Sequence, residues 1–164
     1  MTKTLVIYYS LEGSTKKIAE WIGKETGVDV AAVHPRRELK AKGFGKYILG
    51  GFQVVTKQKP ALQPFTLNLD EYDIVLLGAP IWAGTFAPPV NTLLSSYLKN
   101  KKVGYFYCYE GGDKNAVAKA KRAVNKENTL ISAFACLGVA KNFDLIKEKV
   151  ADWAKSVIKE CENQ

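Results

Sequence analysis

The feature that most constrains the fold is the regular alternation of two hydrophobic patterns along the chain. Short apolar segments, rich in β-branched and aromatic residues, predict strands at Thr4–Tyr9, Val28–Val33, Ile74–Gly78, Val103–Cys108 and Leu130–Leu137. Segments with apolar residues at helical spacing follow most of these strands. Parallel strands need such crossover helices, and the helices cover both faces of the sheet. The alternation therefore predicts an α/β fold, in which a five-stranded parallel sheet lies between two layers of helices.

Each predicted helix carries one apolar stripe. The first helix is expected to end near Gly27, and its stripe consists of Thr15, Ile18, Ala19 and Ile22. The later stripes are Val90, Leu93, Leu94, Tyr97 and Leu98; then Ala116, Val117, Ala120 and Val124; then Ile146, Val150, Trp153, Ala154, Val157, Ile158 and Cys161. A chain of 164 residues with these elements is expected to form a single domain, residues 1–164.

The segment 34–66 is an unusually long connection between the second and third predicted strands. Residues 34–59 hold seven basic side chains against Glu38 alone, which is much of the formal net charge of +8. A helix is predicted within residues 43–56. The basic patch has three interpretations: a solvated surface, a docking site for an acidic redox protein or ligand, or a surface for nucleic acid or membrane. No nucleic-acid-binding motif accompanies it, so a nucleic-acid partner is not expected.

Other residue counts exclude several classes of site. The three cysteines lie far apart without a CxxC motif, and His34 is the single histidine, so neither a metal site nor a histidine-based triad is expected. Isolated cysteines are typical of reduced, buried thiols in a cytoplasmic protein. No apolar run approaches the roughly 18 residues of a membrane span. The N-terminal segment lacks the apolar region of a signal peptide.

The first of three candidate binding loops follows the first strand and consists of Ser10, Leu11, Glu12, Gly13, Ser14 and Thr15. Gly13 permits unusual backbone angles, and Ser14 and Thr15 are expected to begin a helix. The free N–H groups of that first turn, together with the helix dipole, favour an anion such as phosphate. An ordinary capped helix start is the alternative interpretation. Glu12 is unexpected in such a loop, because its carboxylate has the same negative charge as the anion that the loop would bind.

The second candidate loop spans residues 78–89 and directly follows the third strand. Its candidate binding residues are Ala79, Pro80, Ile81, Trp82, Ala83 and Gly84. No amphipathic stripe includes Trp82, so its ring is either a packing residue or a stacking surface for a flat ligand.

The third candidate loop spans residues 108–115 and follows the fourth strand. Its candidate residues are Tyr109, Glu110, Gly111 and Gly112. Tyr109 offers a second aromatic surface, and the two glycines leave backbone groups accessible to a heterocycle. The alternative is a simple surface turn before a helix.

Ligands of open parallel sheets bind beyond the carboxyl ends of the strands, where these three loops are expected to meet. A phosphate site at one end and aromatic surfaces at the other match the shape of FMN. The first loop resembles the phosphate loop of the flavodoxin family, and the GAPIWAG sequence resembles the family loop whose aromatic residue stacks on the isoalloxazine ring. The resemblance is nearest to the short-chain form. It implies a doubly wound, three-layer sandwich with strand order 2-1-3-4-5, and FMN as the cofactor.

Three features depart from that family pattern. Glu12 stands where flavodoxins usually have threonine. Ala83 and Gly84 follow Trp82, and the flexible peptide that flavodoxins commonly place next to the stacking residue is not assigned to either of them. Flavodoxins are also typically acidic, whereas this chain carries a net charge of +8.

The resemblance favours a one-electron carrier, a flavodoxin-like electron-transfer protein in which no side chain acts as catalytic acid or base. An FMN-dependent NAD(P)H:quinone-type oxidoreductase is the first alternative, and a flavin-free interaction module with the same fold is the second. Either a monomer or a homodimer is expected. Receiver domains share this topology but need acidic strand ends, and low-molecular-weight tyrosine phosphatases need a Cys-x5-Arg loop; neither occurs here.

Overall fold

The structure is a computed structural model that describes residues 1–38 and 58–163. Its parallel strands are β1 (Thr4–Tyr8), β2 (Asp29–Ala32), β3 (Ile74–Trp82), β5 (Lys102–Tyr109) and β6 (Thr129–Leu137). They lie in the order β2-β1-β3-β5-β6, so the predicted order of five parallel strands is confirmed. A sixth, short strand, β4 (Thr85–Phe86), pairs antiparallel with the end of β3 and was not predicted.

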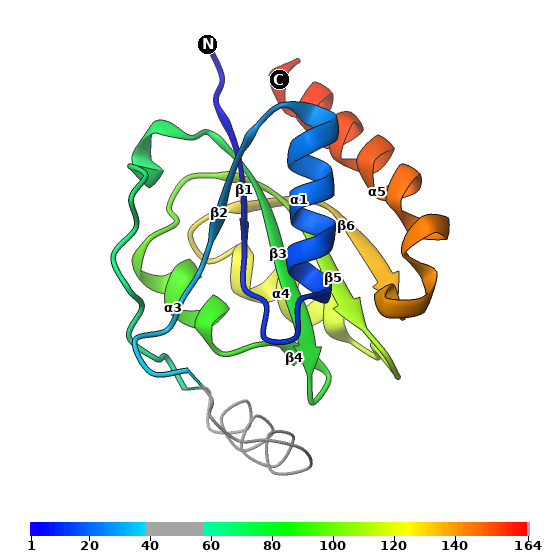
Figure 1. The fold of residues 1–164 in the computed structure, drawn as a ribbon. Coiled ribbons are helices and arrows are strands. Elements are labelled where there is room, and N and C mark those ends of the chain that lie inside the picture. The colour runs from blue at the N-terminus through cyan, green and yellow to red at the C-terminus, as the bar shows by residue number, and fades with distance from the viewer. Residues whose placement is uncertain (39–57, 164) are drawn as a thin grey trace.

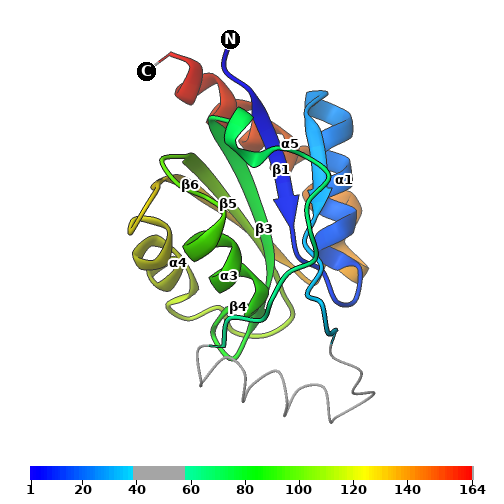
Figure 2. The ribbon, with the colours of Figure 1, turned by 90° about the vertical axis from the view of Figure 1, so that its left-hand side faces the viewer.

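The helices form a layer on each face of the sheet (Figures 1 and 2). Helices α1 (Ser14–Thr26) and α5 (Val139–Glu162) cover one face, and α3 (Pro89–Ser96) and α4 (Ala116–Val124) cover the other. A short 3-10 helix, η1 (Leu69–Glu71), precedes β3. Within residues 1–38 and 58–163, none of the helices combines the length and the apolar composition that a membrane crossing requires.

The alternation of side chains along the strands divides the core into two halves. On β1, Leu5 and Ile7 pack in the cluster beneath α3 and α4, whereas Val6 and Tyr8 pack beneath α1 and α5. All five residues of this strand are buried. Strands that are buried on both faces have apolar residues at nearly every position, which is the pattern that made them recognisable in the sequence.

The predicted helical stripes are largely buried. All four stripe residues of α1 are buried, and Gly27 ends that helix with φ 71° and an N–H bond to the Gly23 carbonyl. The predictions for Tyr97 and Val117 were wrong, because both side chains are exposed. Helix α3 ends at Ser96, before Tyr97. In α4 the buried residues are Ala116, Ala120 and Val124, and Val117 lies one position away from this stripe.

One predicted strand boundary needs correction, and one predicted helix lies outside the described residues. Strand β3 continues to Trp82 instead of ending at Gly78, because it pairs with β5 as far as Pro80 and then with β4. The predicted helix within 43–56 and four of the basic residues of the patch, Lys40, Lys42, Lys46 and Lys57, lie outside the described residues. The described residues on either side of this segment pair with each other, because Pro35 forms an isolated antiparallel bridge with Leu62.

Gly78 on β3 leaves room for the side chain of Phe106 on β5. It pairs with Phe106 in the register of the two strands, and the Phe106 ring is fully buried on the α1 and α5 face. A Cβ atom on residue 78 would overlap this ring. The side chain of Phe106 therefore occupies space that any other residue at position 78 would fill.

Replacing Gly78 by alanine is expected to lower the free energy of unfolding by roughly 1–3 kcal/mol, the usual cost of overpacking a core. Urea denaturation followed by circular dichroism measures this difference. The matched control is Gly112→Ala, since Gly112 is exposed and a Cβ there meets no atom within 4 Å. Equal stability of the two variants would show that the core yields to the added methyl group.

Candidate functional site

A cavity of about 430 Å³ lies at the carboxyl edge of the sheet. This volume is within the usual range of small-molecule sites, about 300–1,000 Å³. Residues from all three predicted loops line it: Ser10, Leu11, Glu12, Ser14, Thr15, Pro80, Ile81, Trp82, Ala83, Cys108, Tyr109, Glu110 and Gly111. The loops meet because β1, β3 and β5 are adjacent and parallel, so their ends reach the same edge.

Four predicted site residues do not line this cavity. Gly13 is the residue before α1, Ala79 is buried in the core beneath α3 and α4, Gly84 lies in the turn after β3, and Gly112 is exposed. Their backbone still shapes the loops that form the walls. Cys108 lines the cavity although it was assigned to the strand and not to the site. Its position at the carboxyl end of β5 is the sequence signal that indicated this placement.

The N-terminus of α1 forms one end of the cavity. Gly13 adopts φ 97° and accepts the first helical hydrogen bond, from Lys17 N–H, at 2.9 Å. The N–H groups of the three residues between them, 14–16, consequently have no acceptor within the helix. The first turn contains no acidic side chain, and no side chain caps it. This end of the cavity can therefore bind an anion through backbone donors and the helix dipole.

Ser10 and Thr15 add structure to this end. Ser10 Oγ accepts a hydrogen bond from Gly13 N–H at 3.1 Å, which stabilises the turn between β1 and α1. Thr15 is only 1% exposed, and it also lines the cavity.

Glu12 contributes to the cavity lining and is exposed to solvent. A solvated carboxylate ~6 Å from a bound anion repels it by less than about 1 kcal/mol per unit charge pair at the dielectric constant of water. Charge-assisted hydrogen bonds contribute roughly 1.5–3 kcal/mol each. Several backbone donors at the α1 terminus thus outweigh the repulsion from Glu12.

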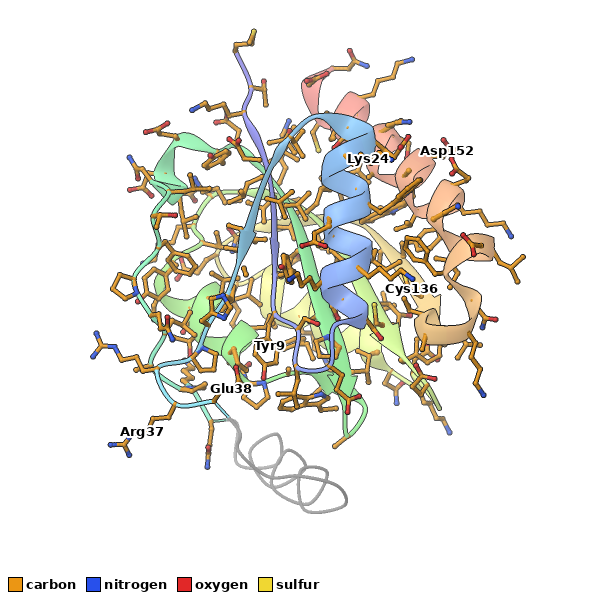
Figure 3. All side chains as sticks on the ribbon, in the orientation of Figure 1. Tyr9, Lys24, Arg37, Glu38, Cys136 and Asp152 are labelled. Carbon is orange, nitrogen blue, oxygen red and sulfur yellow. The ribbon has the colours of Figure 1, made fainter. Side chains whose placement is uncertain are left out.

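Two aromatic residues, Trp82 and Tyr109, also line the cavity. Trp82 contacts Tyr9 edge-on, with ring centroids 5.7 Å apart and an interplanar angle of 80°. The Tyr9 hydroxyl in turn donates a hydrogen bond to Glu38 at 2.8 Å, and Figure 3 shows these two side chains at the lower edge of the sheet. Burial and this hydrogen bond raise the pKa of Tyr9 well above its usual value, so the hydroxyl remains a donor at neutral pH. Tyr9 thereby supports Trp82 from behind.

Tyr109 belongs to a column of tyrosine rings on one face of β5. Its ring lies 5.6 Å from that of Tyr107, which is stacked on Tyr105 at 5.4 Å. The Tyr107 hydroxyl donates a hydrogen bond to Asp113 at 2.7 Å. Burial and this hydrogen bond raise the pKa of Tyr107. The column and its hydrogen bond hold Tyr109 in place at the cavity.

A tight hairpin between β3 and β4 forms the rim beside Trp82. Trp82 pairs with Thr85, so Ala83 and Gly84 are the two loop residues, and both have positive φ, 47° and 74°. This is the combination that a type I′ turn requires, for which Asn-Gly is the favoured sequence. An alanine at positive φ is strained. Lys119 donates a hydrogen bond to the Gly84 carbonyl at 3.1 Å and secures the turn.

The comparisons with known proteins agree on the fold of this chain. A family model described as Flavodoxin matches residues 3–157. The crystal structure of a flavoprotein from Lactobacillus acidophilus NCFM in complex with FMN is 26% identical, with a TM-score of 0.71, and the match covers 88% of this chain and 97% of that chain.

Two more distant structures show the fold alone. A protein of Bacteroides uniformis ATCC 8492, provisionally described as a flavoprotein, is 23% identical with a TM-score of 0.78, over 94% of this chain and 98% of that chain. The oxidised Flavodoxin 2 of Bacillus cereus is 16% identical with a TM-score of 0.60, over 97% of this chain and 99% of that chain.

The strain at Ala83 leads to a stability prediction. Replacing Ala83 by asparagine, which tolerates the left-handed region, is expected to raise the free energy of unfolding by about 1 kcal/mol. Replacing it by valine is expected to lower that free energy, because a β-branched side chain is disfavoured at positive φ. Urea denaturation of the two variants beside the natural protein tests both directions. A destabilising Ala83→Asn would contradict the assignment of this turn.

Proposed function

The chain belongs to the flavodoxin family, and we propose that it binds FMN in the cavity at the carboxyl edge of the sheet and serves as an electron carrier. The observation that carries this proposal is the composition of the cavity lining. It combines backbone N–H donors without acceptors in the helix with the rings of Trp82 and Tyr109. A phosphate ester joined to a planar heterocycle needs both of these environments.

Each part of the cavity has a role in this proposal. The backbone N–H groups at Ser14 and Thr15 would hold the phosphate, with hydroxyl groups of the same loop as further donors. Trp82 and Tyr109 would enclose the isoalloxazine ring and exclude water from it. The flavoprotein of Lactobacillus acidophilus, whose structure contains FMN, supports this assignment through its similarity over 88% of the chain.

The side chains of the cavity are compatible with a carrier. The lining contains Glu12 and Glu110, both exposed, and neither a histidine nor a basic residue occurs among the described residues that line it. FMN supplies the redox chemistry when it is bound, so the protein has only to bind, orient and shield it. A carrier of this kind needs no catalytic acid or base.

Stepwise anaerobic reduction of the FMN-loaded protein tests the carrier assignment. We expect a half-reduced form with long-wavelength absorbance to accumulate, because a carrier transfers single electrons. Visible spectra recorded during the titration provide the readout. Direct two-electron reduction, accompanied by rapid oxidation of NADH or NADPH, would instead identify the protein as an oxidoreductase.

Paired titrations with FMN and riboflavin test the binding mode, since riboflavin lacks the phosphate. Ser14→Asp places a carboxylate at the α1 N-terminus, where it stabilises the helix and competes with phosphate. It is expected to weaken FMN binding about 10- to 100-fold, equivalent to the loss of one charge-assisted hydrogen bond, and to leave riboflavin binding unchanged. Quenching of flavin fluorescence measures both dissociation constants.

Two further variants serve as controls for this titration. Ser14→Asn has the same shape as the aspartate without its charge and should keep most of the FMN affinity. Trp82→Ala removes a ring surface and should weaken the binding of FMN and of riboflavin by a similar factor. If Ser14→Asp affected the two flavins equally, the phosphate would not lie at the α1 N-terminus.

A further inference from the structure

Two of the three cysteines are neighbours in the sheet, and one of them lines the cavity. Cys108 on β5 and Cys136 on β6 are directly paired in the parallel register of these strands. Their side chains project to the same face of the sheet, into the cluster beneath α1 and α5. Cys136 is the last residue but one of β6, so it lies near the carboxyl edge of the sheet. Thiols that the sequence separates by 27 intervening residues are therefore adjacent in the fold.

The surroundings of the two thiols differ. Cys108 lines the cavity and is 5% exposed, whereas Cys136 is fully buried. The neighbouring Cys108 thiol and burial raise the pKa of Cys136. Cys108 is thus the sulfur that a ligand in the cavity can reach, and Cys136 is its fully buried neighbour.

The spacing of the strands permits a bond between these sulfurs. Neighbouring strands lie about 4.7–4.9 Å apart, and disulfides join Cα atoms about 4.4–6.8 Å apart. The Cα separation expected for paired positions on adjacent strands therefore lies within the range that disulfides join. Both cysteines are free thiols in the structure.

We propose that Cys108 and Cys136 form a reversible dithiol–disulfide pair that exchanges electrons with a flavin bound in the cavity. On oxidation, the two S–H bonds break and one S–S bond forms, and the two electrons and two protons that are released pass to oxidised FMN. The reverse step returns them from reduced FMN to the disulfide. This inference rests on the proposed function, because the cavity flavin is the oxidant.

Cys161 provides an internal control for this proposal. It lies on α5, and its backbone carbonyl accepts a hydrogen bond from Lys102 Nζ at 2.8 Å. Lys102 is the first residue of β5, and Cys108 is six residues further along the strand. Six strand residues span about 20 Å. Cys161 is consequently near the opposite end of β5 and too far away to bond with Cys108.

The first experiment counts thiols in FMN-free protein after treatment with diamide, an azo compound that oxidises thiols. The denatured natural protein is expected to lose two of its three thiols, with a mass decrease of two hydrogen atoms. Cys161→Ser should form the same intramolecular disulfide, whereas Cys136→Ala should form none. An unchanged thiol count in the natural protein, or a disulfide that includes Cys161, would overturn the proposal.

The second experiment measures how many electrons the oxidised, FMN-loaded protein accepts from dithionite. The natural protein is expected to accept twice as many electrons per FMN as Cys136→Ala, because the disulfide takes a second pair. Equal numbers would overturn the exchange with flavin. If FMN fails to bind at all, the proposed function and the exchange with flavin both fail, while the thiol count still decides whether the disulfide forms.

Discussion

The parallel pairing of β1, β3 and β5 is the interaction on which the rest of the structure depends. It brings the carboxyl ends of three strands to one edge, so that residues 10–15, 80–83 and 108–111 enclose a single cavity. The close packing of Gly78 on β3 against Phe106 on β5 belongs to the same pairing. Binding residues thus occupy the loops, and the sheet determines the distances between them.

The two kinds of binding group in the cavity are preorganised by different means. Backbone conformation prepares the anion donors, because Gly13 in the left-handed region precedes α1 and the next N–H groups have no helical acceptor. Side-chain hydrogen bonds support the aromatic rings, because Glu38 and Asp113 accept from Tyr9 and Tyr107, which contact Trp82 and Tyr109. A ligand meets groups that are already in position, which lowers the entropic cost of binding.

The sequence was sufficient to predict the strands, the helices and the three loops between them, because buried parallel strands and amphipathic helices have different hydrophobic periodicities. The sequence was not sufficient to predict β4, because Ala83-Gly84 lacks the Asn-Gly signal of a type I′ hairpin. Ala83 has a positive φ in the turn that the pairing of Trp82 with Thr85 closes. The pairing of Cys108 with Cys136 depends on strand register, which hydrophobic patterns alone do not specify.

The proposed flavin site would hold phosphate at the α1 N-terminus and a flavin ring between Trp82 and Tyr109. Proton–nitrogen NMR spectra of the isotope-labelled protein, recorded with FMN and with riboflavin, would locate both parts of the ligand. We expect both ligands to shift the amide signals of Trp82 and Tyr109, and we expect FMN alone to shift strongly those of Ser14 and Thr15. Identical shifts at Ser14 and Thr15 with both ligands, or shifts confined to other surfaces, would contradict this proposal.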